Sequence, residues 1–166
     1  MARPSQAFLE ASRSRLEDIL TRQIPLGGAM ELKLGRLDSE GIALQAPLEP
    51  NINDKGTAFG GAMTSLMILA GWSLGRLVLL DEDSPAELVI AEAAITFSAP
   101  ADGAMEARCG WPAAAVLEGF RARLDERGRA RLDLEPALYH AGGLVATLRA
   151  RYAAVDRDRQ RKRKTA

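Results

Sequence analysis

The longest apolar run of the chain lies between residues 59 and 80, where only Arg76 and a few small polar residues interrupt it. A run of this length predicts either a helix that crosses a membrane or a core helix that other elements surround. Thr64, Ser65 and Ser73 lie inside the run, and the segments on either side have the patterning of a water-soluble sheet. We therefore predict a buried central helix and no membrane span.

Strands are predicted on both sides of this helix, because apolar and polar residues alternate there between turn residues. An amphipathic helix over residues 5–22 precedes them. A second helix over residues 113–127 separates the later strands, with one apolar face made of Val116, Leu117, Phe120 and Leu124. The predicted strands cover residues 30–37, 41–47, 88–98, 104–110, 129–139 and 144–155.

The order of these elements predicts the architecture. A sheet of about six antiparallel strands has one face that must be covered. One helix that is apolar on nearly every side covers that face only if the sheet curls around it. We therefore predict an α+β hotdog fold, in which a curved antiparallel sheet wraps around a long central helix. An N-terminal helix and one inserted helix complete it.

Composition fits a single folded domain in the cytoplasm. The 166 residues are 47% apolar and 27% charged, which is typical of a folded protein with a real core. Cys109 is the only cysteine, so no internal disulfide forms, and together with a single histidine it argues against a metal site. The N-terminus lacks the apolar segment of a secretory signal. We divide the chain into a lead-in helix (1–24), a hotdog domain (25–155) and a tail (156–166).

The zero net charge hides an asymmetry. Residues 157–166 carry six basic side chains and one acidic one, so the rest of the chain is acidic. A tail of this kind is usually solvated and disordered, although it could also hold an anionic partner. No aromatic residue lies between the charges to stack on bases, so we do not expect nucleic acid to bind.

The loop over residues 51–61, Asn-Ile-Asn-Asp-Lys-Gly-Thr-Ala-Phe-Gly-Gly, leads directly into the central helix. Gly56, Gly60 and Gly61 let the backbone turn sharply and let a ligand approach it closely. The first amides of the helix carry the partial positive charge of its N-terminus and point into that space. A thioester carbonyl, or the oxyanion that it becomes, is a group that such amides stabilise. An ordinary polar loop before a helix remains the alternative interpretation.

Residues 53–61 resemble the Asn-x-x-Gly-x-x-His-Gly-Gly signature of hotdog-fold acyl-CoA thioesterases, with Phe59 at the position of the histidine. The longer stretch from Pro47-Leu48-Glu49-Pro50 to Ala70-Gly71-Trp72 is similar to the YiiD C-terminal type of thioesterase domain. The segment Ile95-Thr96-Phe97-Ser98-Ala99-Pro100 also resembles the Ile-x-Tyr-x-x-Pro segment of hotdog domains. The resemblance covers residues 25–155.

This resemblance implies a homodimer, or a dimer of dimers, with sites between subunits. The substrate would be an acyl thioester of coenzyme A or of acyl carrier protein, lying against the N-terminus of the central helix. Coenzyme A or phosphopantetheine would enter only as part of the substrate, and no separate cofactor or metal is implied. By analogy, the amides of Gly61 and Gly60 would bind the thioester oxygen, and Asn53 would orient the substrate or an attacking water.

The chain departs from the family pattern at two positions. Phe59 replaces the histidine, and Ile68 stands nine residues later, where relatives with the histidine carry a catalytic carboxylate. Neither side chain does acid–base chemistry, so a base or nucleophile must come from elsewhere. Asp54 is the nearest carboxylate, although aspartates in loops commonly bond their own backbone. Ser65 is a hydroxyl about 6 Å further along the helix, but it has no evident base.

The candidate catalytic residues are therefore Asn53, Asp54, Gly61 and Ser65. Substrate contacts are assigned to Asn51, Thr57, Phe59, Gly60 and Thr64, the two threonines having local backbone bonding as their alternative. Three residues outside the loop have plainer interpretations. Glu92 is a surface residue or, if buried, a site carboxylate. His140 is a surface residue at a hairpin tip, and Cys109 is a small buried hydrophobe.

Three functions fit this sequence to different degrees. The leading hypothesis is a thioesterase that polarises the substrate carbonyl with the Gly61 amide, while Asn53 and Asp54 assist the attack of water. The missing histidine and helix carboxylate motivate a second hypothesis, a hotdog module that binds acyl thioesters without hydrolysing them. A hydroxyacyl dehydratase is disfavoured, because that chemistry resembles a histidine and carboxylate pair and the loop offers Phe59 instead.

Overall fold

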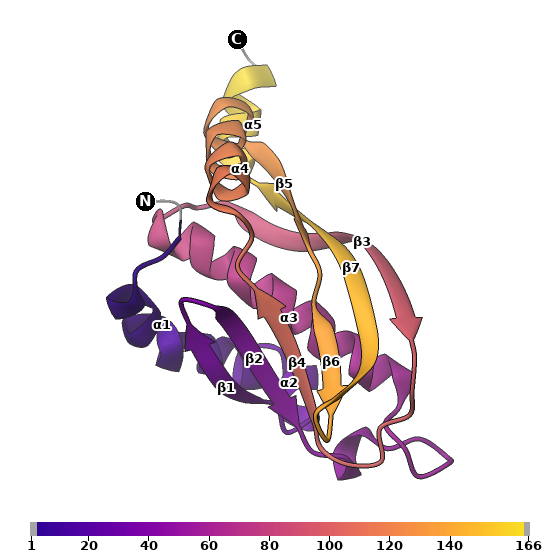
Figure 1. The fold of residues 1–166 in the computed structure, drawn as a ribbon. Coiled ribbons are helices and arrows are strands. Elements are labelled where there is room, and N and C mark those ends of the chain that lie inside the picture. Colours follow the sequence, from indigo (N-terminus) through magenta and orange to yellow (C-terminus); the bar gives the residue numbers. More distant parts are fainter. Residues whose placement is uncertain (1–2, 165–166) are drawn as a thin grey trace.

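The computed structural model describes residues 3–164 and contains a seven-stranded antiparallel sheet (Figure 1). The strand order is β1-β2-β4-β6-β7-β3, and β5 also pairs with the long strand β7. The strands are β1 (Lys33–Asp38), β2 (Gly41–Ala46), β3 (Glu87–Phe97), β4 (Met105–Gly110), β5 (Arg129–Leu134), β6 (Ala137–His140) and β7 (Gly143–Val155). Strand β3 therefore forms one edge of the sheet.

The helix α3 (Gly60–Asp81) crosses one face of the curved sheet, and the sheet bends around it (Figure 1). It contacts strands from β2 at one side of the sheet to β3 at the other. The remaining helical segments are α1 (Gln6–Asp18), a π-helical turn η1 (Ile19–Gln23), α2 (Pro25–Ala29), a 3-10 turn η2 (Glu49–Asn51), α4 (Ala114–Arg127) and α5 (Arg157–Lys164). The α+β hotdog fold predicted from the sequence is confirmed.

Burial explains why α3 is apolar on nearly all sides. It is long and apolar enough to cross a membrane by composition alone, but the sheet covers most of it, including Leu66, Met67 and Leu74. Tyr152 of β7 lies directly against Gly71, where no side chain would fit, and its hydroxyl donates a hydrogen bond of 2.8 Å to the carbonyl of Ile68. The prediction of a buried central helix is therefore confirmed.

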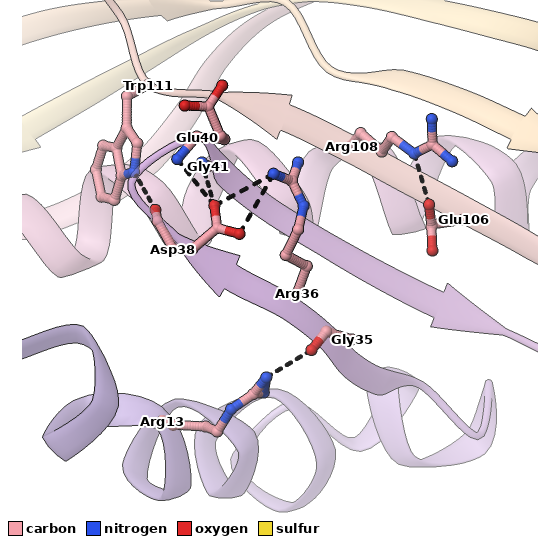
Figure 2. Close-up of polar contacts among 9 residues, drawn as sticks. All are labelled: Arg13, Gly35, Arg36, Asp38, Glu40, Gly41, Glu106, Arg108 and Trp111. Carbon is pink, nitrogen blue, oxygen red and sulfur yellow. Dashed lines mark hydrogen bonds and ion pairs between the residues drawn. The ribbon is translucent and has the colours of Figure 1, made fainter. Parts of the chain in front are cut away.

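The turn between β1 and β2 is held by the side chain of Asp38 (Figure 2). One of its carboxylate oxygens accepts hydrogen bonds from the backbone N–H groups of Glu40, at 2.8 Å, and Gly41, at 3.3 Å. The indole of Trp111 donates to the Asp38 carbonyl at 2.9 Å, which joins the turn to the end of β4. Arg13 of α1 donates to two β1 carbonyls and so fixes the first helix beside the sheet edge.

Two of the predicted strands differ from the structure. The segment predicted as one strand over residues 129–139 forms β5 and β6, with Glu135 and Pro136 between them. Pro136 has no N–H to donate to a strand ladder, so it interrupts the pairing. Residues 30–32 were predicted to begin the first strand but follow the short helix α2, and Glu31 has a positive φ of 53°.

Two helical predictions also need correction. Val116 was predicted on the apolar face of α4 but is 46% exposed, whereas Leu117, Phe120 and Leu124 are buried. Residues 157–164 were expected to be disordered and instead form α5. The carboxylate of Asp156 caps this helix by accepting hydrogen bonds from the backbone N–H groups of Asp158, at 3.1 Å, and Arg159, at 3.0 Å. The last two residues of the predicted tail, 165–166, lie outside the described residues.

Candidate functional site

The loop over residues 52–59 joins η2 to the start of α3, and backbone hydrogen bonds hold both of its ends. The N–H of Phe59 donates to the carbonyl of Asn51, and the N–H of Ala58 donates to the carbonyl of Ala101, both at 2.7 Å. The second bond ties the loop to the segment that follows β3. These two contacts fix the position at which α3 begins.

The side chain of Asn53 organises the interior of the loop. Its Oδ1 accepts from the backbone N–H groups of Lys55, at 2.8 Å, and Thr57, at 3.2 Å. Its Nδ2 donates to the Thr57 hydroxyl, at 2.9 Å, and to the carbonyl of Ala58, at 3.4 Å. Asn53 and Thr57 therefore hold the loop in shape, which is the local role that we had given Thr57 as its alternative.

Asp54 lies at the outer side of this loop. Its carboxylate is 80% exposed and forms an ion pair of 2.8 Å with Lys55, which is also exposed. Exposed pairs of this kind contribute little stability, and solvent screens them. The Asp54 carboxylate is therefore free to leave Lys55 and contact a water or a ligand at the loop.

Asn51 is buried beneath the loop, with 2% of its surface exposed. Its Nδ2 donates to the carbonyls of Met30, at 3.0 Å, and Pro47, at 2.7 Å. Among the described residues its Oδ1 has no hydrogen-bond partner, although it is buried. The contacts of Asn51 thus tie the loop to the segments on either side of the β1–β2 hairpin.

Three backbone N–H groups are open at the start of α3. Within residues 3–164, those of Gly60, Gly61 and Ala62 have no acceptor, and the first bond of the helix runs from the N–H of Met63 to the carbonyl of Phe59 at 3.0 Å. No side chain caps this end. Open donors at the positive end of a helix are suited to bind a carbonyl oxygen or an oxyanion.

Two hydroxyls in the second turn of α3 point back toward the start of the helix. Thr64 donates to the carbonyl of Gly60 and Ser65 donates to that of Gly61, both at 2.8 Å. A hydroxyl bonded in this way can still accept a hydrogen bond, but no base lies in contact with it to make it a nucleophile. Both side chains are half-buried, and through these bonds their hydroxyls lie at the carbonyls of the two glycines that begin the helix.

Aromatic rings flank the open amides. The Phe59 ring packs against Gly61 so closely that a side chain there would collide with it, and Phe97 lies 3.5 Å from the place where a Gly60 side chain would begin. Phe59 and Phe97 are 57% and 52% exposed. Phe97 was not among the predicted site residues, although it belongs to the segment 95–100 that resembles hotdog domains. The amides therefore lie between apolar walls that suit an acyl chain.

The two residues that depart from the family pattern supply no acid or base. Phe59 is an aromatic wall, and Ile68 packs against the hydrophobic core. Glu92, for which we had kept a possible site role, is an exposed residue of β3 that pairs with Arg151. Burial raises the pKa of the Cys109 thiol to about 12, so it is not a thiolate at neutral pH. Its interpretation as a buried hydrophobe agrees with the structure.

His140 ends β6 and bonds to the segment that follows β3. Its Nε2 lies 2.7 Å from a carboxylate oxygen of Asp102, and its Nδ1 lies 2.9 Å from the carbonyl of Ala104. The bond to Ala104, and then the bond to Asp102, raise the pKa of the imidazole. Both ring nitrogens face acceptors, so the protonated imidazolium satisfies the geometry best. His140 therefore joins two segments and does not reach the start of α3 through any hydrogen bond in the described structure.

Comparisons with known proteins agree with this architecture. The family model described as "Putative thioesterase (yiiD_Cterm)" matches residues 13–156. The structure is similar to that of a Chlorobaculum tepidum protein of unknown function, with 28% sequence identity and a TM-score of 0.86, covering 89% of this chain and 96% of that chain. It is also similar to a "putative thioesterase" from Shewanella oneidensis, with 28% identity and a TM-score of 0.75, covering 88% of this chain and 98% of that chain.

A more distant likeness shows the breadth of the fold. A Haemophilus influenzae thioesterase shares 11% sequence identity at a TM-score of 0.66, covering 87% of this chain and 90% of that chain. At this identity only the fold is shared. The same sheet and central helix are therefore built from very different sequences.

Proposed function

Because this chain belongs to the "Putative thioesterase (yiiD_Cterm)" family of hotdog-fold proteins, we propose that it hydrolyses an acyl thioester of coenzyme A or of acyl carrier protein. The observation that carries this proposal is the set of open N–H groups at Gly60, Gly61 and Ala62, bordered by apolar rings. A polar anchor for the thioester oxygen thus lies beside apolar surface for the acyl chain.

In the proposed reaction, the Gly61 amide, assisted by that of Gly60, donates to the thioester oxygen. Water attacks the carbonyl carbon, and the negative charge that develops on the oxygen faces the positive end of α3. One such donor is typically worth about 3 to 4 kcal/mol in the transition state. The carbon–sulfur bond then breaks, giving a carboxylic acid and a thiol. Coenzyme A or phosphopantetheine is the leaving thiol.

We assign the activation of water to Asp54. Its carboxylate is the exposed acid of the loop, and a contact with water requires it to leave only a solvent-screened pair with Lys55. Asn53 acts as a positioning residue, since its amide holds the loop that carries Asp54. Thr64 and Ser65 border the thioester and offer hydroxyl oxygens as acceptors.

We propose that two copies of the chain pair along the edge strand β3. This strand spans 11 residues, and nearly all of them are exposed on both faces of the sheet. Its exposed apolar side chains include Val89, Ile90 and Phe97. A long exposed apolar edge is normally covered by a partner. Phe97 packs on Gly60, so a partner at this edge lies beside the open amides and completes the site.

A second candidate function is acyl-thioester binding without turnover. Phe59 and Ile68 stand where hotdog acyl-CoA thioesterases with the histidine signature carry a histidine and a carboxylate, and the Thr64 and Ser65 hydroxyls bond back to the helix. These observations leave the open amides as an anchor for a thioester, with Asp54 as the only loop carboxylate. The two candidates differ in whether thiol is released.

The experiment that separates them is a thiol-release assay across acyl-CoA chain lengths and one acyl carrier protein, with calorimetric binding of the same thioesters. Hydrolysis that falls at least about tenfold in Asp54→Asn supports the enzyme. Glu118→Gln is the matched control, because Glu118 is an exposed carboxylate of α4 far from the loop. Binding without thiol release supports the second candidate. If the protein neither binds the thioesters nor releases thiol, both candidates are rejected.

A further inference from the structure

A cleft of about 350 Å³ lies between the end of α4 and strands β5 and β7. It is at the end of the molecule away from the loop 52–59 (Figure 1). The helix α3, which separates the two places, has 22 residues and so spans about 33 Å. The cleft is lined by four arginines and four small apolar residues: Arg123, Arg127, Arg129, Arg131, Ala130, Ala153, Ala154 and Val155.

The local fold explains why these arginines converge. Arg123 and Arg127 are one helical turn apart at the end of α4, and the left-handed Gly128 (φ 65°) turns the chain from that helix into β5. Arg129 and Arg131 lie on one face of β5, with Ala130 buried between them. Their partners on β7 are Val155 and Ala153, whose small side chains leave space above the sheet.

The protein balances the charge of the cleft only in part. No acidic side chain lines it, and within the described part of the chain none of its four arginines is close enough to a carboxylate to form an ion pair, although Arg131 lies near enough to Asp133 to lower the pKa of that carboxyl. Other arginines of this end are paired: Arg157 with Glu87, Arg159 with Asp125 and Arg151 with Asp133. The dipole of α4 accounts for Arg127 at its C-terminus but not for the two strand arginines.

We propose that this cleft binds the adjacent phosphates of a nucleotide. Four like charges around one concavity repel one another, and a ligand with several negative charges removes that repulsion. Guanidinium groups match phosphate oxygens with two parallel hydrogen bonds, which makes arginine the usual partner of phosphate. The volume suits a small ligand, and Ala153 and Val155, which lie on the same face of the sheet as Arg129 and Arg131, offer apolar surface to a base.

Two sources supply this chemistry: the nucleotide end of coenzyme A and a free nucleoside diphosphate. The test is isothermal titration calorimetry with ADP, coenzyme A, adenosine and inorganic pyrophosphate. ADP and coenzyme A are expected to bind, and adenosine is not. Equal affinities for ADP and coenzyme A identify a general nucleotide site, whereas binding of coenzyme A alone identifies coenzyme A as the source of the phosphates. None of these ligands is a thioester, so the result does not depend on hydrolysis.

The decisive variant is Arg129→Gln/Arg131→Gln, which removes two exposed charges and leaves Ala130 in place. Its control is Arg15→Gln/Arg22→Gln, which removes two exposed charges from the helical segments before β1. The cleft variant should weaken binding of the phosphate ligands at least about tenfold, and the control by less than about twofold. Equal weakening in both variants, or no binding of any phosphate ligand, would overturn the proposal.

Discussion

At the scale of single residues, the Phe59 ring packs against Gly61, beside the open amides. A side chain at Gly61 would collide with the Phe59 ring, which is the exposed end of a rotatable side chain and not backbone. The ring can therefore turn away at small cost, but the added methyl and the displaced ring then crowd the Gly61 amide. The position constrains function more than stability.

We expect Gly61→Ala to lower thioester hydrolysis or binding by about tenfold or more, with a change in unfolding free energy below about 1 kcal/mol. Gly119→Ala is the control, because nothing lies within 4 Å of a side chain at that helical glycine. The control should gain about 0.5 to 1 kcal/mol and keep its activity. Thermal unfolding and thiol release measure both effects. A Gly61→Ala protein with parental affinity and turnover would contradict the assigned role of this amide.

Cys109 gives a second prediction at this scale. Its thiol is buried, and desolvation raises its pKa to about 12, so the nucleophilic thiolate is scarce at neutral pH. The folded protein should react with a thiol-specific reagent at pH 8 at least about a hundredfold more slowly than the protein in denaturant. Absorbance after addition of an aromatic disulfide reports this directly. Rapid labelling of the folded protein would mean that the end of β4 opens readily.

At the scale of elements, His140 joins the β6–β7 hairpin to the segment that follows β3. The bonds to Ala104 and Asp102 raise its pKa in the folded state. A raised pKa means that folding favours the protonated form. The stabilisation is therefore complete below the unfolded pKa of about 6.5 and is lost as pH rises through the higher folded value.

The melting temperature of the parent should therefore fall between about pH 6 and pH 8 relative to that of His140→Gln. Asp102→Asn, which keeps the shape of the side chain and removes its charge, should reduce this difference. Differential scanning calorimetry across the pH range measures it. If the parent and His140→Gln change in parallel, protonation of His140 does not stabilise the contact between these elements.

The elements themselves were largely predictable from the sequence, because they follow from local periodicity. The apolar run of α3 and the alternating residues of β3 and β7 predicted where these elements lie in the chain. Their order then predicted a sheet that wraps around the helix. The misplaced elements depend on single residues: Pro136 divides a strand, and Asp156 caps α5. Neither effect appears in the alternation of apolar and polar residues.

The loop could be located from the sequence, but its contacts could not. Asn53 was predicted to orient the substrate or an attacking water, and the structure shows both ends of its amide bonded within the loop. Asn51 reaches the carbonyl of Met30, which is 21 residues away and becomes a neighbour only after the sheet has formed. Side-chain partners of this kind depend on the folded backbone, so residue type and spacing do not specify them.

At the scale of the whole molecule, the proposed pairing along the edge strand β3 would link assembly to function. In the described sheet β3 has a single partner strand, β7, and its other side is open. The exposed apolar side chains of β3 include Val89 (53% exposed) and Ile90 (37% exposed). Phe97, the last residue of the strand, lies beside the open amides. If a second copy of the chain completes the site at this edge, a substitution that breaks the dimer should also abolish the activity.

Val89→Lys tests this link, because a charged lysine on an exposed edge disfavours pairing with another strand. The parent should elute as a dimer of the 17.9 kDa chain and the variant as a monomer, by size-exclusion chromatography with light scattering. Val116→Lys is the control, since Val116 is equally apolar and 46% exposed but lies on α4. It should remain a dimer. A monomeric parent, or a Val89→Lys protein that stays dimeric, excludes pairing at this position of β3. A monomeric Val89→Lys that keeps full thioester turnover would mean that one chain holds the complete site.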